Sequence, residues 1–171
     1  EDEMFNPCFE IGFNFYEKIK HLNEAVFQFC NLNEINASAC VDERGKFSEE
    51  KFYKLCRIAA ILGTLQAGYT SFPYLGKNTE DIIAGESLLG VSITGWMTRP
   101  ELFNSDILKT GAQIVKATNK EVAEFIGINQ AARTTTVKPS GNASVILQTS
   151  SGIHPEHSKY YFRIMQLNKD S

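Results

Sequence analysis

Thr-Thr-Thr-Val-Lys-Pro-Ser-Gly-Asn-Ala-Ser, residues 134–144, reads as a strand, a tight turn and the start of a helix. Three threonines and a valine favour β structure, and Pro139 ends the run because it has no N–H to donate. A helix beginning near Ala143 would leave free backbone N–H groups in its first turn, and such groups bind phosphate without a net positive charge. The alternative is an ordinary connection between a strand and a helix.

A long helix is expected earlier in the chain. Ser48 is a typical N-cap, and the two glutamates that follow it suit the first helical turn. Apolar residues then recur at helical spacing, which predicts a helix to about Ala67 that ends at Gly68. Cys56 falls on the apolar face of this helix, so it is interpreted as a small core residue.

Further strands and helices alternate after this helix. Residues 90–96 (Gly-Val-Ser-Ile-Thr-Gly-Trp) predict a short buried strand. Ser105 is expected to cap one helix, and Asn119 a second one that ends at Gly127. Residues 160–167 predict a last strand. Strands that alternate with helices are typical of an α/β fold with a mainly parallel sheet.

Asn6-Pro7-Cys8-Phe9-Glu10 places an amide, a thiol and a carboxylate at alternate positions. In an extended chain these side chains would lie on one face, about 6–7 Å apart along the backbone. Pro7 favours this conformation because it pushes the residue before it towards the extended region, and Phe9 would then face the other way, into packing. The three polar groups suit a reaction centre, although a buried cysteine beside a surface glutamate is the commoner arrangement.

Composition excludes several classes of protein. The 171 residues are 43% hydrophobic and 22% charged, which is typical of a globular chain. A net charge of −3 gives no basic footprint for nucleic acid. No run of 18 apolar residues predicts a membrane helix, and the acidic start does not resemble a secretory signal. We therefore expect a cytoplasmic protein that binds neither membrane nor nucleic acid directly.

The four cysteines, at positions 8, 30, 40 and 56, include no Cys-x-x-Cys pair. This spacing argues against a structural zinc site and against a secreted disulfide framework. Reduced thiols are the default in the cytosol, and no metal is expected to bind this chain. The apolar residues before Cys30 predict that it lies in the interior, at the start of a strand.

Four stretches occur together in a fixed order: residues 6–10, residues 29–36 (Phe-Cys-Asn-Leu-Asn-Glu-Ile-Asn), residues 134–144 and residues 151–155 (Ser-Gly-Ile-His-Pro). This ordered set resembles the large catalytic subunit of ribonucleotide reductase, from about residue 4 to the end of the chain. The sequences of the last two stretches are more similar to the adenosylcobalamin-dependent class than to the class that uses a di-metal radical subunit.

The resemblance implies a role for each residue of the first stretch. Cys8 would carry a transient thiyl radical that takes hydrogen from C3′ of the ribose. Glu10 would act as general base on the 3′-hydroxyl, and Asn6 would orient the sugar hydroxyls. Cys30 matches one half of the redox dithiol; its partner in the family lies upstream of the radical loop, whereas no cysteine precedes Cys8 here.

The resemblance also implies a substrate-phosphate loop, made of Pro139, Ser140, Gly141, Asn142, Ala143 and Ser144. The backbone N–H groups of residues 141–143 and the two serine hydroxyls would be the donors, and Lys138 could add a cation. The substrate would be a ribonucleoside di- or triphosphate, the cofactor adenosylcobalamin, and the external reductant of the thioredoxin type.

The implied fold is part of a ten-stranded α/β barrel with a radical-cysteine finger loop, and residues 1–171 would form one partial barrel domain. Because the motif starts at residue 6 without an initiator methionine, the chain is expected to work with a separate upstream piece. Two alternatives remain. One is a nucleotide-phosphate-binding module without catalysis, and the other is a thiol-redox protein that uses Cys8 and Cys30.

Overall fold

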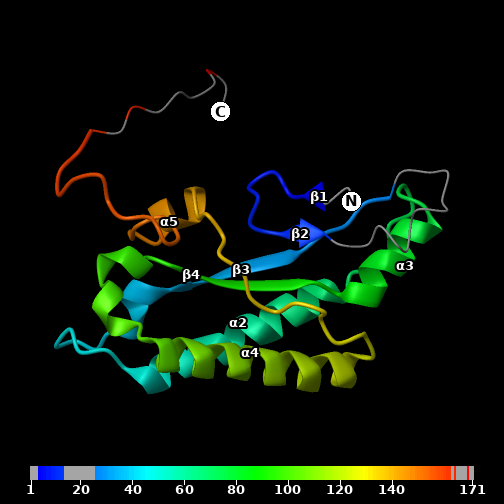
Figure 1. Cartoon of the computed structure of the whole chain (residues 1–171), viewed down its shortest axis with the longest axis horizontal. Helices are drawn as coiled ribbons and strands as arrows, with labels where there is room; N and C mark the ends of the chain where they lie inside the picture. Colours follow the sequence, from blue (N-terminus) through cyan, green and yellow to red (C-terminus); the bar gives the residue numbers. More distant parts are fainter. Residues whose placement is uncertain (1–3, 14–25, 163, 165–168, 170–171) are drawn as a thin grey trace.

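Two parallel strands form the centre of the structure, a computed structural model that describes residues 4–13, 26–162, 164 and 169. β3 (Asn31–Asn36) pairs with β4 (Leu89–Thr94), with Asn31 opposite Leu89 and Asn36 opposite Thr94. Thr135 adds a parallel bridge to Val91, so the segment around it lies beside β4 as a third, short stretch. The predicted parallel α/β arrangement is therefore present, as Figure 1 shows.

Two long helices cover one face of this sheet. α2 (Glu49–Ala67) packs against β3 and β4, and α4 (Ser105–Ile126) packs against α2. Apolar side chains fill the space between the sheet and these helices, among them Ile35, Phe52, Leu89, Val91 and Val115. This layer is the hydrophobic core.

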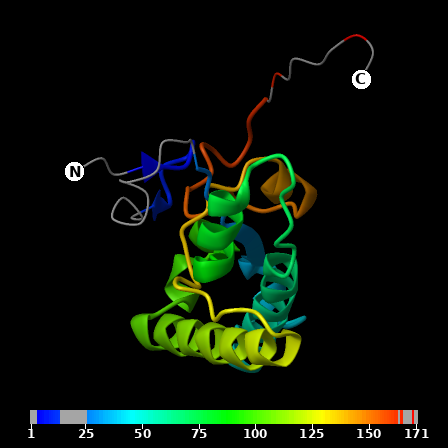
Figure 2. The same ribbon diagram turned by 90° about the vertical axis from the view of Figure 1, so that its right-hand side faces the viewer.

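Shorter elements connect or cover the main ones. They are the hairpin strands β1 (Met4–Phe5) and β2 (Gly12–Phe13), the helices α3 (Lys77–Glu86) and α5 (Asn142–Ile146), and the 3₁₀ turns η1 (Ala37–Cys40), η2 (Trp96–Thr98) and η3 (Pro100–Leu102). Figures 1 and 2 place the β1–β2 hairpin and α5 on the face of the sheet opposite α4.

The local sequence signals at the helix ends predicted most of the helix boundaries correctly. Ser48 caps α2, and its hydroxyl accepts a hydrogen bond from Lys51 N at 3.2 Å. α2 ends at Ala67, and α4 is stopped by Gly127, which has a positive φ of 76°. The predicted cap Ser105 is wrong by one residue, because Asn104 Oδ1 accepts from the backbone N–H groups of Asp106 and Ile107.

The predicted helix start at Asn119 is wrong, because α4 continues through it. The Asn119 side chain is buried, donates to Thr64 Oγ1 at 2.9 Å and accepts from Ala131 N at 2.9 Å. Asn119 therefore joins α4 to α2 and to the segment that returns to the sheet. The predicted strand at 160–167 is also wrong for Tyr160–Phe162, which are exposed and irregular; most of its remainder lies outside the described residues.

Candidate active site

The face of the sheet opposite α2 and α4 carries the polar residues of the candidate site. Along β3, Asn33 and Ile35 face the helices: Asn33 Nδ2 donates to Ala59 O in α2 at 2.8 Å, and Ile35 belongs to the core. Because neighbouring side chains of a strand point to opposite faces, Leu32 and Glu34 lie on the other face. Gly90, Ser92 and Thr94 lie on that face in β4, since Leu89 and Val91 belong to the core.

The Asn6–Glu10 stretch forms the tight loop of the β1–β2 hairpin, so the predicted extended conformation is wrong. Asn6 closes the loop: its N–H donates to Ile11 O, and its Oδ1 accepts from Ile11 N at 3.0 Å. Phe9 has a φ of 61°, which reverses the chain, and its ring is 76% exposed and stacked on Phe5. The expectation that Phe9 packs inward is wrong as well.

The loop holds the two reactive groups in different environments. The Cys8 thiol is exposed. Glu10 is anchored to the sheet, because its carbonyl oxygen accepts a hydrogen bond from Thr136 Oγ1 at 3.1 Å. Its carboxylate oxygen Oε2 is buried and has no hydrogen-bond partner among the described residues. The loop therefore presents a thiol outward and a carboxylate inward.

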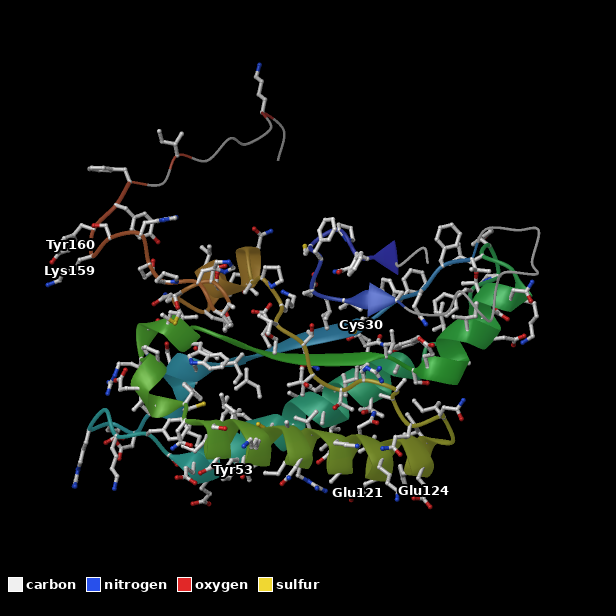
Figure 3. The ribbon with its side chains drawn as sticks, viewed as in Figure 1. Cys30, Tyr53, Glu121, Glu124, Lys159 and Tyr160 are labelled. Carbon is white, nitrogen blue, oxygen red and sulfur yellow. The ribbon has the colours of Figure 1, made fainter. Side chains whose placement is uncertain are left out.

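Glu10 and Cys30 line the same cavity, which has a volume of about 280 Å³. Its wall comes from the hairpin loop, the end of α3, the start of β4 and residues 132–136, and consists of Glu10, Ile11, Gly12, Cys30, Glu86, Leu88, Leu89, Ala132, Arg133, Thr135 and Thr136. Figure 3 shows Cys30 at the start of β3, below the hairpin. The cavity volume approaches the range of small-ligand sites.

Cys30 is held in the thiol form. Burial, and to a smaller extent the nearby charge of Glu10, raise its pKa from 9.0 to about 12. Gly90 leaves the space that the sulfur needs, because a Cβ atom at this position would lie only 3.1 Å from Cys30 Sγ. The predicted interior position of Cys30 is confirmed in part: the residue directly precedes β3, but it is half-buried and lines a cavity.

The predicted phosphate loop lies between the Thr135 segment and α5. Gly141 precedes α5 and caps it without a side-chain hydrogen bond, so the first N–H groups of this helix lack an acceptor within the helix. The Ser140 side chain is fully buried, and its Oγ has no partner among the residues that the structure describes. The Ser144 hydroxyl instead donates within the loop, to Gly141 O at 2.7 Å.

The far end of this loop is fixed to β4. Thr94 Oγ1 accepts from Gly152 N at 3.0 Å and donates to Ser150 O at 3.2 Å. Ser151 Oγ donates to Ser140 O, which ties the two ends of the loop together. Gly152 has a positive φ of 56°, and a Cβ atom there would lie 2.8 Å from Lys138 O. The close approach and the left-handed φ both favour glycine at this position.

Some residues of the site were missed by the sequence interpretation. Glu34 pairs with Lys138, and Thr136 holds the Glu10 loop. Period-two alternation from Cys30 would have placed Glu34 on the same face, and alternation from Thr136 would have placed Lys138 there. Lys138, considered as a phosphate cation, is engaged by Glu34.

No cluster of three or more His, Cys, Asp or Glu side chains suited to a metal ion occurs among the described residues. Within the same residues, every helix is too short or too polar to cross a membrane.

Comparisons with known proteins, by sequence and by structure, find similarity to the same kind of enzyme. The chain matches no protein-family model. It is 27% identical over 106 residues, 60% of its length, to an adenosylcobalamin-dependent ribonucleoside-triphosphate reductase of Euglena gracilis, of which it covers 14%. It is 25% identical over 97% of its length to a "Probable adenosylcobalamin-dependent ribonucleoside-triphosphate reductase" of Dictyostelium discoideum, of which it covers 20%.

The fold is also that of a solved reductase. A crystal structure of a B12-dependent (class II) ribonucleotide reductase superposes on 88% of the chain with a TM-score of 0.65 and 20% identity, and the chain covers 22% of that protein. The chain thus spans about a fifth or less of the length of the curated relatives that it matches. In sequence and in fold, it is related to a segment of the adenosylcobalamin-dependent ribonucleotide reductases.

Proposed function

We propose that this chain provides the radical-cysteine loop, one redox cysteine and the substrate-phosphate loop of a ribonucleotide reductase, which converts ribonucleotides to deoxyribonucleotides. The observation that carries the proposal is the shared cavity of Glu10 and Cys30, beneath the loop that presents Cys8. The reaction requires a base, a reducing thiol and a hydrogen-abstracting thiol; the first two line one cavity, and the third lies on the hairpin loop above it.

Cys8 begins and ends the reaction. As a thiyl radical it takes the hydrogen atom from C3′ of the ribose, so that an S–H bond forms as the C–H bond breaks. A hydroxyl could not replace the thiol, because an O–H bond is much stronger than the ribose C–H bond. The hydrogen atom returns to C3′ at the end, which regenerates the radical on Cys8.

Glu10 and Asn6 act on the sugar hydroxyls. The Glu10 carboxylate takes the proton of the 3′-hydroxyl, which favours loss of the 2′-hydroxyl as water. Its buried, unpartnered Oε2 supports this role, since a buried carboxylate oxygen needs a donor. The Asn6 oxygen is used in the loop, so Asn6 orients the sugar through its amide N–H groups.

Cys30 supplies half of the reducing equivalents. Cys30 and a second thiol, from the remainder of the enzyme, give two electrons and two protons and become a disulfide. The ribonucleotide gains them as it loses water, so the reaction balances. A thioredoxin-type dithiol then reduces the disulfide. The raised pKa of Cys30 keeps its proton available for this step.

Residues 139–144 bind the phosphates through the free N–H groups at the start of α5 and through the buried Ser140 hydroxyl. The substrate would be a ribonucleoside triphosphate, as the names of both curated relatives say of those proteins; a diphosphate would use the same donors. Residues 1–171 then form part of the ten-stranded barrel, whose remainder completes the open sheet edge of β3.

The cavity that Glu10 and Cys30 share does not fit adenosylcobalamin. The cavity at Cys30 has a volume of about 280 Å³, and a corrinoid is far larger than this space. The cavity suits the sugar of a nucleotide. We therefore assign none of the residues that line this cavity to the cofactor.

Two variants test the proposal in the enzyme reconstituted with the remainder of the barrel. Glu10→Gln keeps the shape of the side chain but removes the base, so it should slow deoxyribonucleotide formation about 10²–10⁴-fold. Cys30→Ser should permit hydrogen abstraction from C3′, measured as exchange of a tritium label, but block repeated turnover. Cys40→Ala serves as the control, because Cys40 belongs to the core on the other side of the sheet. Repeated turnover by Cys30→Ser would contradict its redox role.

A further inference from the structure

Lys138 and Glu34 form an ion pair on the polar face of the sheet, immediately before the phosphate loop. The Glu34 side chain is 7% exposed and the Lys138 side chain 25%. The second carboxylate oxygen of Glu34 is buried and has no partner among the described residues. Lys138 is therefore the group that balances the buried charge of Glu34.

Lys138 also marks the residue at which the chain leaves the sheet. Thr136 N donates to Val91 O, which is a bond between neighbouring strands. Two residues later, Lys138 N donates to the side chain of Ser92, at 2.9 Å. Ser92 lies opposite Glu34 in the register of β3 and β4. Glu34, Ser92 and Lys138 thus form one row of side chains across three neighbouring segments.

The row supplies a fixed point at the start of the phosphate loop. The other end is fixed by Thr94, which bonds to Ser150 and Gly152. Pro139, which directly follows Lys138, has no N–H with which to continue the sheet. Without the row, the start of the loop would be held only through Ser140 O, which accepts from Ser151 at the far end.

We propose that Glu34, Ser92 and Lys138 are positioning residues that hold the phosphate loop in place, and that Lys138 is not itself a phosphate ligand. The proposal rests on the proposed function, because it takes residues 139–144 to be the phosphate site. Lys138 could reach a phosphate only by leaving Glu34 as a buried, unbalanced carboxylate, and such a charge is costly.

The chemistry of buried ion pairs gives a test. Removing one partner leaves the other charge uncompensated, whereas replacing both with apolar side chains of similar volume is often neutral or stabilising. A positioning pair should therefore be restored by the double replacement. A phosphate ligand cannot be restored in this way, since the charge that binds phosphate would still be missing.

The experiment compares Glu34→Leu, Lys138→Met and the double variant in the full chain. Binding of inorganic tripolyphosphate is measured by calorimetry. Each single variant should weaken binding by about tenfold or more, and the double variant should return to within about threefold of the unmodified chain. Lys116→Met is the control, because it removes the same charge from an exposed position on α4. A double variant as weak as Lys138→Met would overturn the proposal and make Lys138 a ligand.

Hydrogen exchange is the second readout, and it needs no ligand. It is measured at the backbone amide of position 138, which donates to Ser92 Oγ, and at those of residues 147–149, which donate to carbonyl groups of residues 143–145. Exchange should be faster in each single variant and return to normal in the double variant. Unchanged exchange in both single variants would overturn the positioning role. If the unmodified chain fails to bind tripolyphosphate, the proposed phosphate site is wrong, whereas the exchange data still decide whether the row holds the loop. Ser92→Ala, a milder change, should speed exchange in the same residues.

Discussion

Alkylation of the native chain should label Cys8 rapidly and Cys30 very slowly. The thiolate is the reactive form of cysteine. Burial, assisted by the charge of Glu10, raises the pKa of Cys30 from 9.0 to about 12. At a pH of about 8, this shift lowers the thiolate fraction about 10³-fold relative to an unperturbed thiol. Cys8 is exposed on the hairpin loop and has no such burial.

The assay is timed reaction with iodoacetamide, followed by mass spectrometry of the peptide that contains each cysteine. Burial also raises the pKa of Cys40 to about 11 and that of Cys56 to about 12, so both should react slowly in the native chain. In urea all four should react at similar rates, which is the control for intrinsic differences between the peptides.

Glu10→Gln separates the two causes of the Cys30 shift. The variant removes the negative charge but leaves the burial, which is the larger cause. Alkylation of Cys30 should therefore become faster, yet remain far slower than that of Cys8. Equal labelling of Cys8 and Cys30 in the native unmodified chain would refute the placement of Cys30 in the cavity.

Three further predictions concern stability and packing. Asn119→Ala removes two buried hydrogen bonds and should lower the free energy of unfolding, measured in urea, by about 2–4 kcal/mol. The control Asn129→Ala removes an exposed hydrogen bond and should lower it by less than about 1 kcal/mol. Similar losses in the two variants would contradict the role of Asn119 in joining α4 to its neighbours. Gly90→Ala brings a Cβ to 2.5 Å from Leu32 Cδ2. It should lower the free energy of unfolding by about 1–3 kcal/mol and expose Cys30 to alkylation. The control Gly85→Ala has open space around the new Cβ and should leave stability unchanged or raise it. The raised pKa of Cys30 means that folding favours the protonated thiol, so the contribution of Cys30 to stability is complete below pH 9 and is lost as the pH rises towards about 12. Urea unfolding on both sides of pH 9 measures this loss. A Cys30→Ala variant should lose less stability over the same pH range.

The sequence predicted the structure correctly where the interactions that determine it are local. The cap at Ser48 and the stop at Gly127 depend on residues within one turn, and both were predicted. Asn119 carries the same local signal as a cap, but its partners Thr64 and Ala131 come from other parts of the fold, and they keep it inside a helix. The ordered motifs likewise predicted the relationship to adenosylcobalamin-dependent reductases, which the comparisons confirm.

The geometry of the candidate site was less accessible from the sequence. Alternation in an extended chain was the basis for placing Asn6, Cys8 and Glu10 on one face. The positive φ of Phe9 and the bonds between Asn6 and Ile11 turn this stretch into a loop instead. The pairing of Glu34 with Lys138 spans 104 positions, and no local pattern specifies a contact over that separation. The barrel beyond β3 and β4 remains a prediction.

The most direct test of the radical role is the Cys8→Ser variant in the enzyme reconstituted with the remainder of the barrel, adenosylcobalamin, a ribonucleoside triphosphate and a dithiol. Deoxyribonucleotide formation and tritium exchange from C3′ are measured together. Because serine cannot relay the radical, the variant should bind the nucleotide as the unmodified enzyme does, yet show neither reduction nor exchange. Reduction by Cys8→Ser above a few per cent of the unmodified rate would contradict the assignment of Cys8 as the hydrogen-abstracting residue.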